Sequence, residues 1–274
     1  SVCTLAIMSA ALAGTGGETG PGAPCTGDTV VAAAVKCLLA ADPFKKAEYT
    51  DLAAALWASG EISETHKPNG NPEAPARPAR DDSKVKLVAP GKMHRLGKGG
   101  TLASRQAIIH SLVHIESWAV DLSWDIIARF GPAYDMPRAF FDDFIQVAVD
   151  EAKHCMMLNT RLEEMGSHYG ALPGHDGLWE SATDTAGNLA ARLAIEHCTH
   201  EARGLDVLPQ TVMRLRNGGD AASADLLWDT IYPDEITHCA AGVKWFTYLF
   251  ERGLVEGPAG ADGATGGEAR GEAG

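Results

Sequence analysis

The segment VAVDEAKHCMMLNTRLEEMG (147–166) places Glu151 and His154 three residues apart in an otherwise apolar helical run. Residues with this spacing lie on one face of an α-helix. A second copy follows 84 residues later in YPDEITHCAAGVKWF (232–246), where Glu235 and His238 repeat the spacing. In both copies an Asp precedes the Glu and a Cys follows the His. One copy is weak evidence for a site, whereas two copies require a common explanation.

The two copies belong to a chain in which apolar residues recur with the helical period of about 3.6, and no convincing strand pattern occurs. The predicted fold class is therefore all-α. Four long periodic segments predict the main helices: 101–130, 137–165, 183–216 and 220–252. Two shorter helices are expected before them, one that follows Asp28 as its N-cap and one over about 44–58. The expected organisation is a flexible segment, N-terminal helices with a Pro-rich connector, a bundle and a disordered tail: 1–27, 28–100, 101–252 and 253–274.

Each of the four long segments carries one glutamate in its apolar stripe. Burying an isolated carboxylate costs several kcal/mol, so buried carboxylates must be protonated, paired or bound to cations. The stripes offer no Lys and at most a fringing Arg. Two single glutamates and two Glu-x-x-His pairs are the ligand set of di-iron and di-manganese carboxylate bundles. The predicted metal ligands are Glu116, Glu151, His154, Glu201, Glu235 and His238.

The spacing of these glutamates predicts two helical hairpins. Glu116 and Glu151 are 35 residues apart, and Glu201 and Glu235 are 34 apart. The interval from Glu151 to Glu201 is 50 residues, which leaves room for a long crossover after the second helix. This arrangement indicates a ferritin-like four-helix bundle with additional N-terminal helices. The alternative is that these Glu and His residues are exposed on helices whose phase is misread.

The aspartates that precede the two motif glutamates have a second predicted role. A histidine that binds a metal through one ring nitrogen needs a hydrogen bond at the other, often to a carboxylate. We expect Asp150 and Asp234 each to orient the histidine on the neighbouring motif helix. The alternative is that both are ordinary exposed helix residues.

Five segments resemble one known family, and the similarity covers roughly 28–252, including DPFKKAEYT. The family is the ferritin-like domain-of-unknown-function family 455, related in fold to the di-iron tRNA hydroxylases. By this resemblance the six predicted ligands match the metal-ligand positions of the family. The family name records no assigned activity, so the resemblance implies fold and site but no substrate. The segments are HSLVHIESWAVDLSWD (110–125), MPRAFFDDFIQVAVDEAKHCMML (136–158), YGALPGHDGLWESA (169–182), EARGLDVLP (201–209) and IYPDEITHCAAGVKWF (231–246).

Several further residues are candidates near the site. His197 lies one turn before Glu201, where the family usually has an apolar residue; it could be a seventh ligand, a proton donor or, as we favour, a core or supporting histidine. His175 and Asp176 lie in the crossover, where they could contact substrate or pack the loop. Gly204 and Gly242 are expected to leave room for an apolar substrate pocket beside the metals. We expect packing roles for His114, Cys155 and Cys239.

Carboxylate and imidazole ligands suit iron, with manganese or a mixed pair as alternatives, and disfavour a structural zinc site. The favoured function is an O2-dependent di-iron oxygenase or oxidase that uses a small-molecule substrate and an electron donor, both unidentified. The alternatives are an iron-handling or peroxide-scavenging protein of ferritin or rubrerythrin type, and a metal-stabilised scaffold without turnover. The chain lacks the paired CxxC motifs of a rubredoxin-like module.

Bulk composition limits the possible partners. The formal net charge of −13 makes nucleic acid an unlikely ligand, and no apolar run is long enough to span a membrane. Six cysteines without a CxxC pair favour a reducing, intracellular compartment. No basic residue occurs before Lys36, so a retained signal peptide is not expected, although an organelle remains possible if a targeting peptide was removed. The composition leaves the oligomeric state open.

Overall fold

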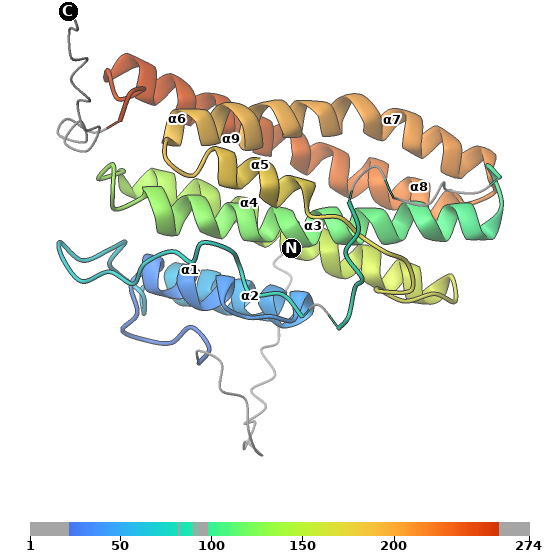
Figure 1. The fold of residues 1–274 in the computed structure, drawn as a ribbon, viewed down its shortest axis with the longest axis horizontal. Helices are drawn as coiled ribbons and strands as arrows, with labels where there is room; N and C mark the ends of the chain where they lie inside the picture. The colour runs from blue at the N-terminus through green and yellow to red at the C-terminus, as the bar shows by residue number, and fades with distance from the viewer. Residues whose placement is uncertain (1–21, 82, 90–91, 93–97, 258–274) are drawn as a thin grey trace, which may run out of the picture.

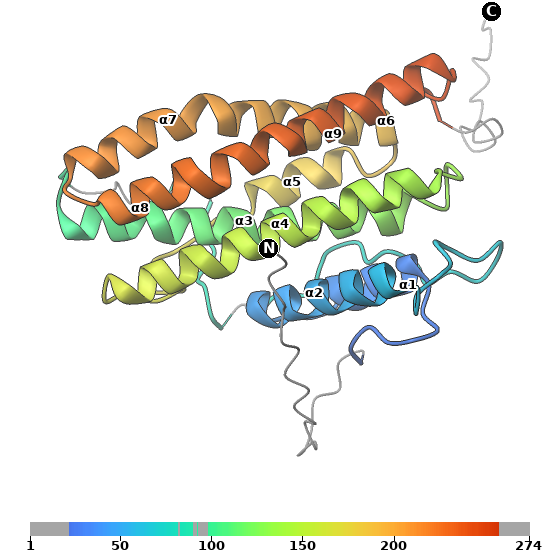
Figure 2. The same ribbon diagram turned by 180° about the vertical axis from the view of Figure 1, so that it is seen from behind.

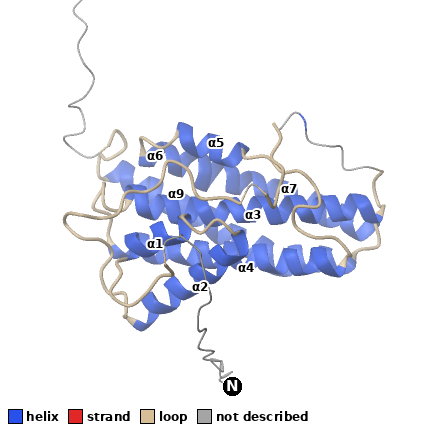
Figure 3. Ribbon diagram, turned by 60° about the horizontal axis from the view of Figure 1, so that its bottom comes forward, coloured by secondary structure: helices blue, strands red, loops and turns tan. Residues whose placement is uncertain are grey.

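The computed structural model describes residues 22–81, 83–89, 92 and 98–257. Within these ranges the regular secondary structure is helical, and the only β pairing is an isolated bridge between Leu87 and Gly174 (Figure 3). The all-α prediction is therefore confirmed. None of the described helices is both long and apolar enough to cross a membrane.

Four long helical units lie side by side along the longest axis of the molecule (Figure 1). The first two are continuous α-helices, and the last two are each interrupted by a π-helical segment. The units are α3 (Leu102–Phe130), α4 (Arg138–Glu164), the run α6 (Leu189–Arg192), η2 (Leu193–His200) and α7 (Glu201–Asn217), and the run α8 (Ala221–Leu226), η3 (Leu227–Ile231) and α9 (Tyr232–Glu251).

The interior of the bundle consists of two apolar clusters separated by a charged layer. The cluster at one end includes Phe140, Phe144 and Trp245, and the cluster at the other end includes Leu158 and Leu227, all of them buried. Burial of one such side chain stabilises the fold by about 1.5–3 kcal/mol. Along each unit, the predicted metal ligands lie at the boundary between the residues of the two clusters. The apolar packing on both sides therefore holds the charged layer at the middle of the bundle.

Two N-terminal helices, α1 (Val30–Leu38) and α2 (Pro43–Ser59), cover the outer face of the α3–α4 hairpin (Figures 1 and 2). A buried ionic cluster fastens this layer, because Lys46 of α2 and Arg80 of the connector both pair with Asp121 of α3. The N-cap of α1 is Thr29, which accepts a hydrogen bond from the amide of Ala32 at 3.2 Å.

The expectation that Asp28 caps this helix is wrong. Its carboxylate instead pairs with Lys36 at 2.7 Å and accepts a bond from the amide of Cys25 at 2.8 Å. The predicted flexible ends, 1–27 and 253–274, lie largely outside the described residues. Within the described part, Thr26 donates a hydrogen bond to Glu61 at 2.7 Å. This contact places residues 22–27 with the N-terminal helices.

The crossover between α4 and α6 contains a short helix, α5 (Gly177–Asp184), where a loop was expected. Its buried Trp179 stacks on Trp118 of α3, with ring centroids 5.9 Å apart. An aromatic pair of this kind contributes about 0.5–1.5 kcal/mol beyond its buried area. The sequence pattern missed α5 because a helix of this length shows too little periodicity.

The π-helical segments were not expected either. The η3 segment ends directly before Tyr232 and Pro233. Proline lacks the backbone N–H of a regular α-helical turn, and a widened turn is one way for a helix to accommodate this loss. The η2 segment, LAIEHCTH, contains neither proline nor glycine, so no residue type in it signals the wider turn.

Candidate metal centre

The charged layer unites side chains from all four helical units of the bundle. Five of the six predicted ligands are buried, with exposed fractions of 6% or less, and Glu201 is half-buried. Glu116 lies near the middle of α3, Glu201 is the first residue of α7 after the π-helical segment, and the motif pairs lie on α4 and α9. Successive ligand glutamates are 34 to 50 positions apart in sequence, and the fold brings them together in one place.

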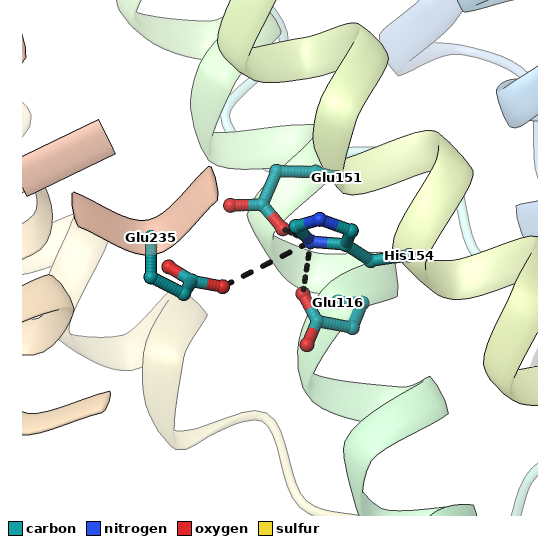
Figure 4. A group of neighbouring side chains, drawn as sticks. All are labelled: Glu116, Glu151, His154 and Glu235. Atoms are coloured by element: carbon teal, nitrogen blue, oxygen red, sulfur yellow. Dashed lines mark ion pairs between the residues drawn. The ribbon is translucent and has the colours of Figure 1, made fainter. Parts of the chain in front are cut away.

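One donor group forms around His154, as Figure 4 shows. The Nδ1 atom of His154 lies 3.5 Å from Glu151 Oε2, 3.8 Å from Glu116 Oε2 and 3.9 Å from Glu235 Oε1. One ligand atom from each of these four residues lies within 4.8 Å of all the others. This spacing fits four ligand atoms around a single cation.

A second donor group forms around His238. Its Nδ1 atom lies 3.0 Å from Glu151 Oε1 and 3.5 Å from Glu235 Oε2. Glu201 completes this group, whose four ligand atoms also lie within 4.8 Å of one another. The group therefore repeats the composition of the first one: three glutamates and one histidine.

The two groups share Glu151 and Glu235. Each of these carboxylates turns one oxygen toward His154 and the other toward His238. Glu116 and Glu201 belong to one group each. A carboxylate in the shared position could contact cations in both groups, whereas Glu116 and Glu201 could each contact a cation in one group only. The sequence spacing did not distinguish the shared from the unshared residues.

The outer nitrogens of both histidines face aspartates on the opposite motif helix. His154 Nε2 lies 3.0 Å from Asp234 Oδ2, and His238 Nε2 lies 3.6 Å from Asp150 Oδ2. Lys153 lies between the aspartates, with its ammonium group 2.6 Å from Asp234 and 3.2 Å from Asp150. This reciprocal arrangement leaves Nδ1 of each ring directed at the glutamates. Sequence reasoning missed Lys153, although it stands between Glu151 and His154 in the motif.

Several polar atoms at the centre of the layer have no hydrogen-bond partner among the described residues. They are Glu151 Oε2, His154 Nδ1 and His238 Nδ1, and all three are inaccessible to solvent. Buried polar atoms in proteins are almost always hydrogen-bonded, and leaving one unpaired costs free energy. These three atoms converge between the helices, and the outer Nε2 atom of His238, 3.6 Å from Asp150, also has no hydrogen-bond partner among the described residues. This donor set therefore fits a pair of cations.

Without a cation the layer balances its charge with protons. Burial, and then the nearby Glu151, raise the pKa of Glu116 well above its usual value. Burial, and then Glu235, do the same for the pKa of Glu201. Burial alone would lower the pKa of His154, but Glu116 and Glu151 raise it to about 11. Cations bound here would take the place of these protons.

Comparison with known proteins adds a family but no activity. The model of a family described as "Protein of unknown function (DUF455)" matches residues 39–258. The chain belongs to this family.

One curated relative of this DUF455 protein is an uncharacterized protein from Haemophilus influenzae, 36% identical over 153 residues. The match covers 54% of this chain and 53% of the relative, so the chain spans about half the length of the curated relative it matches. No solved structure matches the chain significantly. The family and the relative therefore leave the assignment of function to the geometry of the site.

His197 lies beside the donor groups and belongs to neither. It is buried, its ring contacts that of Phe144 with centroids 4.9 Å apart, and its Nε2 atom has no hydrogen-bond partner among the described residues. Burial, reinforced by Arg192, lowers the pKa of His197 to about 3, so the ring is neutral near pH 7. These contacts are those of a core histidine next to the charged layer.

The two crossover candidates contact the edge of the bundle. The backbone oxygen of His175 lies 2.9 Å from His114 Nε2, and the His175 ring accepts a bond from the amide of Gly177 at 3.2 Å. Asp176 pairs with Arg77 at 2.9 Å. Among the described residues, these interactions connect the crossover with α3 and the connector, and none reaches the donor groups.

The two glycines differ in their surroundings. Gly204 has open space where a side chain would lie. At Gly242, in contrast, a Cβ atom would overlap the backbone carbonyl of His197. The expectation that the missing side chain of Gly242 leaves room for a pocket is therefore wrong. The backbone of η2 occupies the space that a side chain at Gly242 would need, so η2 packs directly against α9.

The thiols that follow the motif histidines are not members of either donor group. Cys155 is buried, and its Sγ atom contacts the carbonyl oxygen of Val113 at 3.8 Å. Cys239 is half-buried on α9. Another buried carboxylate, Glu196 in η2, contacts His200 at 2.8 Å and has one oxygen without a hydrogen-bond partner among the described residues. The burial of Glu196 does not follow from the regular helical period, because the wider turn of η2 changes the direction in which its side chains point.

Proposed function

We propose that this protein holds two metal ions, most favourably iron, in a ferritin-like bundle and acts as an O2-dependent oxidoreductase. The observation that carries the proposal is the sharing of Glu151 and Glu235 between two donor groups, each completed by one further glutamate and one imidazole nitrogen. Because each donor group has its own histidine and its own third glutamate, the eight ligand positions support two adjacent cations better than one.

The donor types support the choice of metal. Both groups consist of carboxylate oxygen and imidazole nitrogen, a combination that suits iron and manganese. Structural zinc sites instead contain thiolates and four closed ligand positions. Because each group offers four ligand atoms, an ion that prefers about six ligands would keep positions open for exogenous molecules.

Bound reduced iron would supply the electrons for the reduction of dioxygen, and this chemistry is the basis of the oxygenase or oxidase proposal. The chain itself would orient and enclose the centre. Asp234 would hold the His154 ring by a hydrogen bond, Asp150 would place its negative charge behind the His238 ring, and the apolar clusters on both sides of the layer would limit the access of bulk water.

Metal loading is the first test. The full chain would be purified without oxygen, supplied with Fe(II) and analysed for bound metal, and we expect two ions per chain. The double variant Glu151→Ala/Glu235→Ala should lose both ions, because both bridging carboxylates are removed. The matched control Glu164→Ala/Glu251→Ala removes exposed glutamates from the same two helices and should load normally. Equal loading of the two double variants would refute the proposed site.

The reaction of the loaded protein with O2 is the second test. An oxygenase or oxidase should consume O2 rapidly, and addition of its substrate should change the rate. An iron-handling protein would oxidise Fe(II) repeatedly and release ferric iron without an organic substrate. A scaffold would consume no O2. Stopped-flow measurement of wild type at full loading therefore separates the proposed function from both alternatives.

A further inference from the structure

The η2 segment and α9 approach each other closely at Gly242. Its missing side chain allows the backbone carbonyl of His197 to occupy the space that a Cβ atom would fill. Helices whose contact is made by glycine can bring their backbones together, and residues that flank the contact then lie close as well. The flanking residues here include one cysteine on each element, Cys198 and Cys239.

Both cysteines are close to this contact. Cys198 Sγ is 3.1 Å from the position of a Cβ atom at Gly242. Cys239 precedes Gly242 by three residues, so it lies on the same side of α9, where such neighbours have Cβ atoms about 5–6 Å apart. Burial, and then the charge of the nearby Cys239, raise the pKa of Cys198 to about 11. Both residues are half-buried free cysteines, so reagents can reach them.

We propose that Cys198 and Cys239 form a reversible intramolecular disulfide that joins η2 to α9. A small-molecule disulfide would serve as the oxidant. One thiol of the pair attacks it and releases one small thiol, and the second protein thiol then displaces the other. The two cysteines together lose two hydrogens, which leave on the two small thiols, so atoms and electrons balance. A dithiol reverses the reaction.

The other described cysteines lack this arrangement. Cys25 is exposed and accepts a hydrogen bond from Lys36, with Sγ and Nζ 3.4 Å apart, whereas Cys37 and Cys155 are fully buried in the core. No second cysteine is among the groups that shift the pKa of Cys37 or Cys155. Cys25→Ser is therefore the suitable control substitution, because it removes an accessible thiol away from the η2–α9 contact.

The disulfide would connect two elements that lie next to ligands of the donor group around His238. The η2 segment leads directly into Glu201, and α9 carries Glu235 and His238. A covalent bond between them would hold these ligands at a constant separation and slow the exchange of bound metal. This consequence rests on the proposed function, whereas formation of the disulfide does not.

The experiment uses the full chain, freed of metal with a chelator and incubated with oxidised glutathione. We expect a mass loss of two hydrogens, a cross-linked peptide that contains Cys198 and Cys239, and complete reversal by dithiothreitol. Cys25→Ser should behave in the same way, and Cys198→Ser and Cys239→Ser should lose the cross-link. The disulfide closes a loop between residues 198 and 239 and should therefore raise the Tm of the oxidised wild type by roughly 5 °C above that of the reduced protein.

Phenylarsine oxide provides a second measurement on reduced wild type, because it binds two adjacent thiols at once. It should protect both cysteines from reaction with a maleimide. This measurement uses the wild type alone, so it does not depend on the folding of any variant. Stable glutathione adducts on separate cysteines, or a Cys239–Cys239 bond between two chains, would overturn the proposal. Metal analysis of the same samples reports on the proposed function separately: a chain that forms the disulfide but never binds metal would contradict the metal site alone.

Discussion

The Nε2 atom of His154 on α4 lies 3.0 Å from Oδ2 of Asp234 on α9. This contact holds the imidazole with its Nδ1 atom toward Glu116, Glu151 and Glu235. Asp234 therefore connects the orientation of a ligand on one hairpin to a helix of the other. The Asp150–His238 contact at 3.6 Å repeats the relationship in the opposite direction.

We predict that Asp234→Asn weakens metal binding by about 10- to 100-fold, the usual effect of losing such a supporting carboxylate. All six proposed ligands remain, but His154 loses the negative charge behind its ring. Competition titration with a metal-binding dye measures the affinity. Asp225→Asn is the control, because Asp225 is exposed on α8 and pairs with Arg216 at 3.0 Å. An unchanged affinity in Asp234→Asn would show that the contact does not support a ligand.

Metal binding should release protons and strengthen as the pH rises. The pKa of His154 is raised to about 11, so the ring holds a proton at neutral pH that a metal ion must displace. Each displaced proton makes the affinity increase by up to about tenfold per pH unit. Calorimetric titration with Mn²⁺ at pH 6, 7 and 8 measures the affinity. Repeating it in buffers of different ionisation enthalpy gives the number of protons released. A pH-independent affinity would contradict this prediction.

The same proton makes the stability of the metal-free protein fall as the pH rises, whereas the affinity for metal increases. A histidine pKa above the unfolded value of about 6.5 contributes stability below that pH, and this contribution is lost as the pH rises toward 11. The Tm of the metal-free protein should therefore decline on going from pH 7 to pH 9. Metal should offset this decline, because the bound ions replace the charge of the protons. Differential scanning calorimetry with and without metal measures both effects.

Substitution of Gly242 and of Gly204 by alanine should change the stability of the protein in opposite directions. Gly242→Ala places a methyl group against the His197 carbonyl and should lower the free energy of unfolding by about 1–3 kcal/mol. Gly204→Ala meets open space within α7 and should stabilise the protein by up to about 1 kcal/mol, because alanine is the better helix former. Urea unfolding measures the stability of both variants. Because both carry the same Gly→Ala change, each variant is a control for the other. Equal stability would show that η2 and α9 do not touch at Gly242.

Asp121→Ala should detach the N-terminal layer from the bundle. Lys46 and Arg80 would be left without their shared carboxylate, and breaking a buried ion pair costs about 3–5 kcal/mol. Chemical unfolding measures the loss, and limited proteolysis of the 66–100 connector shows whether the layer opens. The control Asp81→Ala changes an aspartate whose side chain, among the described residues, accepts hydrogen bonds from Ser83, and it should behave as wild type.

The ligand residues were predictable because their spacing follows the period of a single helix. Glu151 and His154 share a face of α4 in any fold that buries the apolar residues of that segment. The need of a metal-binding histidine for a partner at its second nitrogen predicted that Asp150 and Asp234 would face histidines on the neighbouring motif helix, and both aspartates lie there. The assignment of these residues as metal ligands and supports remains a prediction for the loading experiments.

Other features depend on distances between helices, which a single helical period does not contain. The sequence suggested space beside Gly242, yet the packing of α9 on η2 fills it. The sequence suggested continuous α-helices before Glu201 and Glu235, yet both are preceded by π-helical turns. The crossover helix α5 likewise depends on a tryptophan partner on α3.

By itself, the sequence determined the helical class of this protein and the residues that each helix directs into the bundle, because both follow from local periodicity along the chain. Only the tertiary structure decided that Glu151 and Glu235 are shared between two donor groups, that Lys153 lies between two aspartates, and that Cys198 adjoins α9. The reason is physical: the separation and rotation of packed helices arise from side chains distant in sequence, and a shift of about one turn between helices would exchange these partners while leaving each helix unchanged.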